Sequence, residues 1–318
     1  MTYASGQTIA ALDFNTMAQG GAAVNHTVEN VNTLWGVGTG DKGYGQTTLP
    51  TLTPVLAGDP VRGPSSWEIM RLRLNSMLTH QNNTTTGIAT IATGDTVAYQ
   101  SLFASKLTTA TTNRLLANAN ASDITGTAPT ADSWNTATPT TRQITRTATF
   151  GSADQARYFF NAGGKLILTC TAVNTGATAK GADWVTVLQT NFASHSLNGL
   201  VNARGGSGGT ASLVDTTRSY WNLTTSPQKV IRITSATTTV DYSGNNYVEL
   251  SVYSGSAVPF GANGDKGYIV KFQMDLNDVA GDAGDTDNLN LTTTTNITVR
   301  PPATTQLTTN SWGTVTIS

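Results

Sequence analysis

The sequence YIVKFQM at residues 268–274 alternates apolar and polar side chains. Successive side chains of a strand point to opposite faces of its sheet, so this pattern predicts a strand with one buried and one solvated face. Further strand candidates lie at residues 165–170, 230–234, 247–253 and 297–300. Several short strands separated by Gly, Asn and Asp turns predict an antiparallel β-sandwich, Ig-like or jelly-roll-like, over residues 146–318.

The composition of the chain agrees with a mainly β fold. The 318 residues include 31 glycines, and threonine runs at residues 84–86 and 292–295. Threonine is β-branched and favours extended backbone, while glycine supplies turns. Only 12% of the residues are charged, about half the usual quarter. A nearly uncharged, hydroxyl-rich surface suits a subunit that packs against copies of itself.

The balance of charge argues against two classes of partner. Eighteen basic and nineteen acidic residues leave a formal net charge of −1. Such a chain lacks the basic surface that binds nucleic acid or an acidic membrane, so neither partner is expected.

No apolar stretch approaches the ~18–20 residues that span a bilayer. The first residues lack the segments of a secretory signal, which favours synthesis in a cytoplasm without export by a signal peptide.

Helical patterns concentrate in residues 1–82, which we expect to form a small helical and extended docking region. The best-defined helix begins after Ser65, which forms a capping box with Glu68 three positions later. One face of this helix carries Trp67, Met70 and Leu74. A pair of short helices is small for an independent core, so we expect this region to pack against other subunits. Its removal is then expected to leave a folded β-domain.

Residues 83–145 form a connecting region in this interpretation. They are rich in Thr, Ala and Asn and only weakly patterned. Residues 96–118 carry a weak helical pattern, which the low helix propensity of threonine opposes. We assign no core to the connecting region.

The sequence offers little material for catalysis. Its histidines, His26, His80 and His195, lie in separate segments, and no G-x-S-x-G motif is present. Glutamate occurs three times in the chain, which leaves few candidates for the paired carboxylates of glycoside cleavage. We therefore expect neither catalytic residues nor a cofactor. A secreted carbohydrate-active enzyme or an adhesin remains an alternative.

Two further residue types have simple interpretations. The acidic residues Asp278, Asp282, Asp285 and Asp287 supply the oxygen ligands that calcium prefers, but their spacing does not match a D-x-D-x-D-G loop. A solvated loop between two strands is the favoured interpretation.

Cys170 is the single cysteine, which excludes an intrachain disulfide, and its apolar surroundings favour a buried side chain.

Several local motifs stand out in the chain. They are GYGQ at residues 43–46, Trp67 with Leu74 and HQ at residues 80–81, ARYFFNAGGKL at residues 156–166, and PPATT at 301–305 before SWG at 311–313. These motifs resemble a family of tailed-bacteriophage virion structural proteins. The resemblance leaves roughly residues 83–145 unmatched and transfers no catalytic residue. It implies a non-enzymatic virion component of the neck or collar, tail fibre or baseplate kind. Such a component assembles in the host cytoplasm with copies of itself and other virion proteins.

The residues expected at the assembly interface come from two of these motifs. The residues from the capped helix after Ser65 are Trp67, Met70, Leu74 and His80. Those from the aromatic run are Tyr158, Phe159 and Phe160. Three consecutive aromatic residues cannot all face one core, so two are expected to pack inward while the third meets a neighbour. An aromatic anchor entirely within the domain is the alternative. A receptor-binding tail fibre that contacts a host surface glycan is the alternative function.

Overall fold

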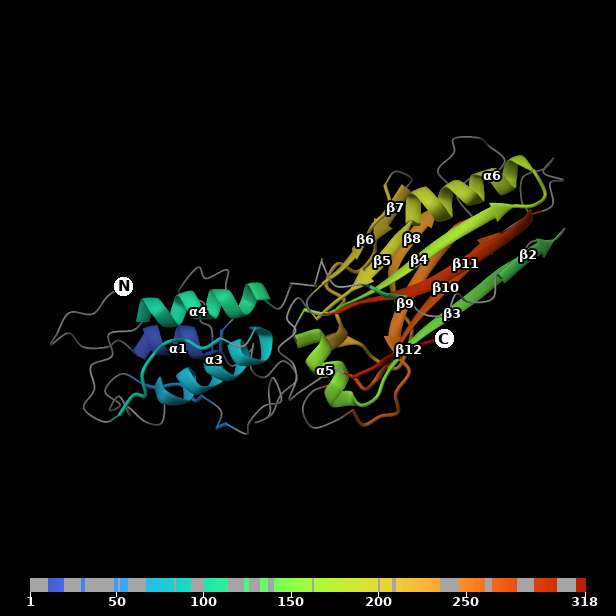
Figure 1. The fold of residues 1–318 in the computed structure, drawn as a ribbon. Helices are drawn as coiled ribbons and strands as arrows, with labels where there is room; N and C mark the ends of the chain where they lie inside the picture. The colour runs from blue at the N-terminus through green and yellow to red at the C-terminus, as the bar shows by residue number, and fades with distance from the viewer. Residues whose placement is uncertain are drawn as a thin grey trace.

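The computed structural model is mainly β, with a few helices (Figure 1). The residues that it describes are 11–19, 30–31, 49–50, 52–56, 67–82, 84–92, 100–113, 123–125, 132–136, 140–161, 163–199, 201–207, 210–234, 246–260, 265–278, 289–301 and 313–318. Their buried hydrophobic side chains form two clusters that share no residue. One cluster belongs to a helical unit, residues 11–113, and the other to a β-sandwich, residues 123–318.

The helical unit consists of α1 (Ala11–Gln19), α3 (Trp67–Asn82) and α4 (Gln100–Asn113) with extended segments beside them. Trp67 joins the three helices: its ring lies 5.2 Å from that of Phe14 and 5.4 Å from that of Phe103, measured between centroids. Glu68 accepts hydrogen bonds from Nε of Arg71 at 2.7 Å and from the backbone N–H of Ile91 at 2.9 Å. Its carboxylate therefore ties α3 to an extended segment. The expected capping partner, Ser65, lies outside the described residues.

Helix α4 lies within residues 83–145, the predicted connecting region, and gives that region a core that its composition does not predict. Phe103, Leu107 and Ala110 of α4 are buried in the helical cluster. The other end of that region also belongs to a folded body, because β1 (Ile124–Thr125), β2 (Asp132–Thr136) and the first part of β3 (Thr140–Phe150) are strands of the sandwich. The described residues between 83 and 145 are thus divided between the helical unit and the sandwich.

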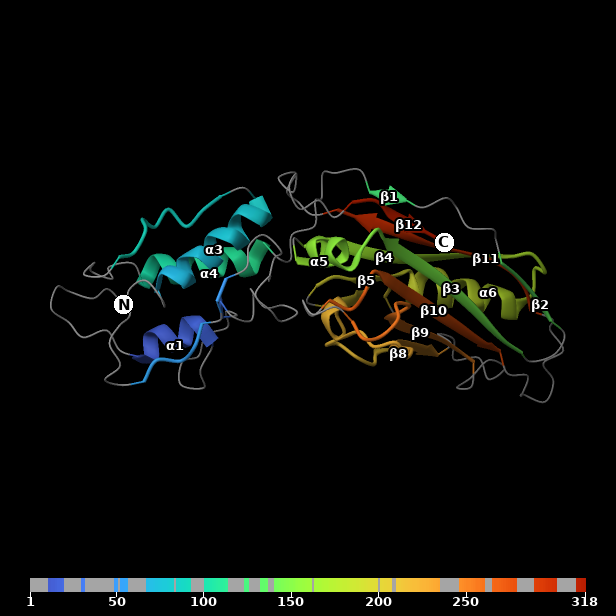
Figure 2. The same ribbon diagram turned by 90° about the horizontal axis from the view of Figure 1, so that it is seen from below.

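The strands of the sandwich form two antiparallel sheets of six strands each within the described residues. Sheet I contains, in spatial order, β1 (Ile124–Thr125) and β2 (Asp132–Thr136) beside β11 (Leu289–Arg300), then β4 (Lys165–Asn174), β5 (Ser194–Leu197) and β6 (Asn202–Arg204). Sheet II runs β12 (Val315–Ile317), β3 (Thr140–Phe150), β10 (Ile269–Asp278), β9 (Tyr247–Ser254), β8 (Gln228–Thr234) and β7 (Thr210–Leu213). Figure 2 shows sheet II from another side, with the helical unit beyond one end of the sandwich.

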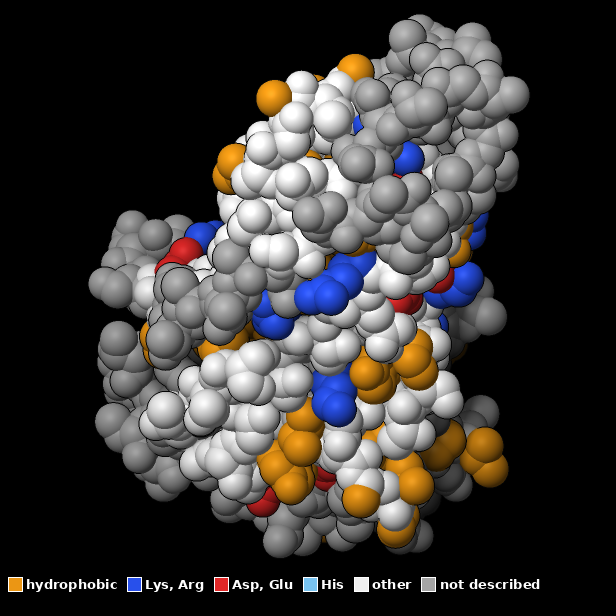
Figure 3. Space-filling model, turned by 90° about the vertical axis from the view of Figure 1, so that its right-hand side faces the viewer, with side chains coloured by type: hydrophobic (Ala, Val, Ile, Leu, Met, Phe, Trp, Pro, Cys, Tyr) orange, Lys and Arg blue, Asp and Glu red, His pale blue; other side chains and the backbone are white. Residues whose placement is uncertain are grey.

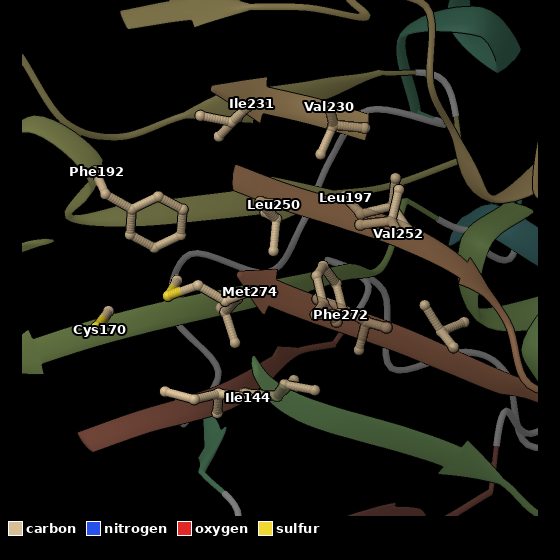
Figure 4. Close-up of a cluster of buried hydrophobic side chains, with 14 of the residues drawn as sticks. Ile144, Cys170, Phe192, Leu197, Val230, Ile231, Leu250, Val252, Phe272 and Met274 are labelled. Atoms are coloured by element: carbon tan, nitrogen blue, oxygen red, sulfur yellow. The ribbon is translucent and has the colours of Figure 1, made fainter. Parts of the chain in front are cut away.

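The core lies between the two sheets. Every second residue of β10 is buried, as the alternation of residues 268–274 predicts, and every second residue of β11 is buried as well. Figure 4 shows side chains of β3, β8, β9 and β10 turned toward Cys170 of β4 and Leu197 of β5. Val230 and Ile231 are both buried because a β-bulge in β8 lets two consecutive residues face inward. Burial also raises the pKa of the Cys170 thiol to about 12.

Helices fill the space around the sheets. Helix α6 (Ala179–Thr186) and the π-helical turn Val187–Phe192 connect β4 to β5, and this turn contacts β4 of sheet I and β8 of sheet II. A short 3₁₀ helix, Tyr220–Asn222, precedes β8. The Lys180 ammonium of α6 lies 3.0 Å from the Asp278 carboxylate of β10, and both side chains are buried. This ion pair attaches α6 to sheet II.

Helix α5 (Ala153–Asn161) and the turn into β4 hold most of the aromatic and glycine motif at residues 156–166. Phe159 and Phe160 are fully buried, and the ring of Phe160 stacks on that of Tyr220 with centroids 4.2 Å apart. Gly163 adopts a φ of +92°, which favours glycine. A Cβ on Gly164 would lie 2.6 Å from the ring of Phe159. The two glycines therefore allow β4 to start directly beneath the helix that precedes it.

Candidate functional site

The apolar residues of α3 that were expected at an assembly interface are core residues of the helical unit. Trp67 is 1% exposed, and Met70 and Leu74 are fully buried. A side chain with no exposed surface in the single chain cannot form a contact with a second one. His80 lies in the last turns of α3, and its side chain is outside the described part of the structure. Trp67, Met70 and Leu74 are thus core residues of the chain and were mistaken for interface residues.

The aromatic run of α5 follows the expected division of two rings inward and one outward. Phe159 and Phe160 belong to the sandwich core, whereas Tyr158 is only partly buried. The guanidinium of Arg157 lies 4.8 Å from the centre of the Tyr158 ring, and burial raises the pKa of the Tyr158 hydroxyl. Tyr158 is the one member of the run that retains surface for a partner.

The predicted calcium ligands are not brought together in the described residues. Asp278 is buried and pairs with Lys180, so an ammonium group occupies the place next to its carboxylate. Asp282, Asp285 and Asp287 lie outside the described residues. Within the described part of the chain, no group of three or more His, Cys, Asp or Glu side chains is placed to hold a metal ion.

The outer face of sheet I is almost uncharged. We call it the threonine face and define it by the outward residues of its strands, which are Ser133, Ile167, Thr169, Thr171, Val173, Ser194, Ser196, Ala203, Asn290, Thr292, Thr294, Asn296 and Thr298. Cross-strand pairs order these residues into rows, such as Thr294 opposite Thr171 and Asn296 opposite Thr169. Val173 is 61% exposed. Charge enters only at one end of the face, where Lys165 lies opposite Arg300.

A bidentate ion pair holds the charged end of the threonine face. Nε and Nη2 of Arg300 donate to the two carboxylate oxygens of Asp123 at 2.8 and 2.7 Å. This pairing lowers the pKa of Asp123 and raises that of Arg300. It also attaches the start of β1 to β11. The charge of Arg300 is therefore matched within the chain.

The outer face of sheet II has the opposite character, and we call it the charged face. Its acidic centre consists of Asp275 on β10 and Glu249 on β9, which are cross-strand partners. Asp275 accepts hydrogen bonds from Gln143 at 2.9 Å and from Gln273 at 3.0 Å. Glu249 pairs with Lys229 at 2.9 Å and with Arg232 at 3.4 Å. Both carboxylates are thus satisfied by neighbouring side chains.

Two tyrosines flank the acidic centre of the charged face. The Arg232 guanidinium lies 3.9 Å from the centre of the Tyr247 ring, and the Lys271 ammonium lies 5.8 Å from that of Tyr253. Burial raises the pKa of Tyr253, and the nearby Asp275 raises it further. Chemically, this face offers amide, carboxylate and cationic hydrogen-bonding groups beside aromatic rings.

His195, one of the three histidines in separate segments, is a buried polar residue of the sandwich. It lies on β5 with its side chain fully buried, and its ring meets that of Phe272 edge-on at 6.2 Å. Neither ring nitrogen has a hydrogen-bond partner within the described residues. Burial lowers the pKa of the imidazole to about 3. The sequence pattern SHSL at residues 194–197 could have indicated this burial, because His195 and Leu197 lie on the same face of a strand.

The described residues at the far end of the sandwich are largely uncharged (Figure 3). Figure 3 looks at this end and shows a short band of Lys and Arg side chains among uncharged ones, with few acidic groups. Among the helices that the structure describes, none combines the length and apolar character needed to cross a lipid bilayer.

Comparisons with known proteins found no relative of this chain. No protein-family model, no curated protein and no solved structure matches the chain. The resemblance to phage virion proteins therefore stays a prediction.

Proposed function

We propose that this protein is a non-enzymatic structural component of a tailed-phage virion, at the neck or collar or in the tail, and that it works as a symmetric oligomer. One observation carries the proposal: the helical unit and the sandwich have separate hydrophobic clusters. A small unit with its own core serves for attachment to another virion protein. The larger sandwich then supplies the bulk of the subunit and its contacts with copies of itself.

The type of sandwich belongs to the same proposal. We assign it to the Ig-like or jelly-roll-like class. Among the described residues, every strand pair of the sandwich is antiparallel, and strands far apart in the chain lie side by side, such as β11 beside β4 and β10 beside β3. This arrangement supports the assignment because such sandwiches join their sheets by long connections.

The charged face supports a non-enzymatic role. Glycosidases keep one carboxyl group protonated as an acid and another free to act as a base or nucleophile. Here Glu249 is paired with two cations, and Asp275 accepts hydrogen bonds from two glutamine side chains. Side chains engaged in this way suit a rigid surface better than proton transfer.

The division into two units gives a direct test. A chain that lacks residues 1–113 is expected to fold, because the sandwich cluster uses no residue before Trp134. A cut after residue 82 is less suitable, since it would expose Phe103 and Leu107 of α4. In the parent phage, the chain without residues 1–113 is expected to be folded by circular dichroism and absent from purified particles. Its continued incorporation into particles would overturn the attachment role of the helical unit.

The full-length chain supplies the second part of this test. Light scattering after size exclusion is expected to give the mass of a defined oligomer. A monomer at about 100 µM, together with absence from particles, would overturn the proposed function as a whole.

The charged face favours a second candidate, a receptor-binding tail fibre. Tyr247 and Tyr253 lie among amide and acidic side chains, a combination that recognises sugars by stacking and by hydrogen bonds to hydroxyl groups. If this function holds, the purified chain binds members of an array of bacterial surface glycans, and Tyr253→Ala weakens binding at least tenfold. Tyr158→Ala on α5, outside the charged face, serves as the control. Equal binding by both variants would exclude the charged face as a glycan site.

A further inference from the structure

We infer that the threonine face is the surface through which one copy of this chain packs against a second copy. The inference rests on the proposed function, since it names the interface of the proposed oligomer. It starts from the contrast between the two outer faces of the sandwich. Lys229, Arg232, Glu249, Lys271 and Asp275 lie on the charged face, whereas none of the thirteen residues that define the threonine face carries a charge.

The lack of charge fits the centre of a protein–protein interface. The buried centres of such interfaces are depleted of charged residues, because each buried charge must be paired. Across the threonine face, Ile167 and Val173 add apolar surface to the hydroxyl and amide groups. The charges of Arg300 and Asp123 stand at its end and neutralise each other. Lys165 keeps one charge at that end, whereas the central rows of the face carry no charge that would oppose burial by a neutral partner.

The chemistry of the face selects a second copy as that partner. Hydroxyl and amide groups each donate and accept hydrogen bonds. Two identical faces of this kind can therefore satisfy each other, as a two-fold interface requires. A glycan is the less suitable occupant, because no aromatic side chain lies among the residues that define the face. Tyrosines for sugar stacking lie on the charged face instead.

The size of the face agrees with a stable interface. Strand β11 has 12 residues, which corresponds to about 40 Å at ~3.4 Å per residue. The strands from β11 to β6 extend over about 20 Å at their usual spacing of ~4.8 Å. Because β5 and β6 are much shorter than β11, the strands do not fill this outline, and the six strands of the sheet together cover about 600 Å². Two stacked faces then bury about 1,200 Å², the lower end of the range for specific interfaces. Sheets of two copies can stack here at the usual ~10 Å separation.

A charge placed in the middle of the face tests the inference. Thr294 lies in a central row opposite Thr171, and Thr294→Arg is expected to weaken self-association of the full-length chain at least 100-fold. Thr147→Arg is the matched control, because Thr147 points outward from β3 on the other sheet. Sedimentation equilibrium gives the association constants. Circular dichroism and thermal melting show whether both variants remain folded.

A second variant keeps the test decisive if Thr294→Arg misfolds. Thr171 is exposed on the same row, and Thr171→Arg is expected to have the same effect. If the wild-type chain forms an oligomer that both variants retain, the inference is overturned while the proposed function stands. If the variants keep their self-association but no longer enter particles, the face meets a different virion protein, and a second copy is again excluded. A monomeric wild-type chain counts against the proposed oligomer itself.

Discussion

Replacing Trp67 by Ala is expected to destabilise the helical unit by about 3–5 kcal/mol, the usual effect of removing a buried Trp side chain. The indole ring is 1% exposed and contacts Phe14 of α1 and Phe103 of α4. Its loss opens a cavity where three helices meet. Since small domains are stable by only 5–15 kcal/mol in total, the substitution removes a large part of the stability of this unit.

Calorimetry of the full-length chain measures this effect. The transition of the helical unit is expected to move to lower temperature or to vanish. The transition of the sandwich is expected to stay, because its cluster contains no residue of the helical cluster. Leu12→Ala is the control in the same unit: Leu12 is 49% exposed on α1, and its truncation should change stability by no more than about 0.5 kcal/mol. Identical melting of the Trp67→Ala and wild-type chains would contradict the assignment of this core.

The sequence predicted those strands whose side chains alternate in hydropathy. Strand β10 is the clearest case, since Phe272 and Met274 are buried while Lys271 and Gln273 face outward. The first part of β11 was missed, although it alternates just as regularly. Thr293 and Thr295 point inward while Thr292 and Thr294 point outward. A run of one residue type carries no contrast between the two faces, so the pattern was invisible before folding.

Helix α4 was doubted because of its threonines, and the structure shows why they are tolerated. Thr108, Thr109, Thr111 and Thr112 each donate the side-chain hydroxyl to the carbonyl oxygen four residues earlier, at 3.0 Å. This bonding satisfies the hydroxyl within the helix. Burial of Phe103 and Leu107 then supplies the stability that propensity alone does not.

The candidate site was predicted less well than the fold, for a related reason. An apolar stripe such as Trp67, Met70 and Leu74 shows that a helix face will be buried. It does not show whether the same chain or another chain covers it. Here α1 and α4 cover the stripe. The threonine face has no apolar stripe at all, and it can be recognised only once the sheet brings its rows together.

Acidification is expected to destabilise the sandwich through His195. The imidazole is fully buried, and its pKa is about 3 in the folded chain against about 6.5 when exposed. Its cross-strand partner on β6 is Arg204, whose positive charge does not favour protonation of the imidazole. Between these two pKa values the unfolded chain binds a proton that the folded chain does not. Stability therefore rises with pH in this window and is lost as the pH falls below about 6.5.

The size of this effect follows from the linkage relation. One proton taken up on unfolding corresponds to about 1.4 kcal/mol per pH unit, so the sandwich should lose roughly 2 kcal/mol between pH 7.5 and 5. Urea unfolding at several pH values measures the slope. The range above pH 5 isolates histidine, because exposed carboxyl groups titrate near pH 4.

His195→Leu is the variant that assigns the slope to one side chain. Leucine fills a similar volume, cannot be protonated, and removes ring nitrogens that have no hydrogen-bond partner within the described residues. The variant should therefore keep its stability at pH 7.5 and lose most of the slope between pH 7.5 and 5. The uncharged substitution Thr171→Val on the outer face of the same sheet should retain the wild-type slope. If the stability of His195→Leu keeps the wild-type slope with pH, His195 does not cause that slope and is protonated in the folded wild-type chain. Such a result would contradict the dry surroundings that the contact with Phe272 indicates.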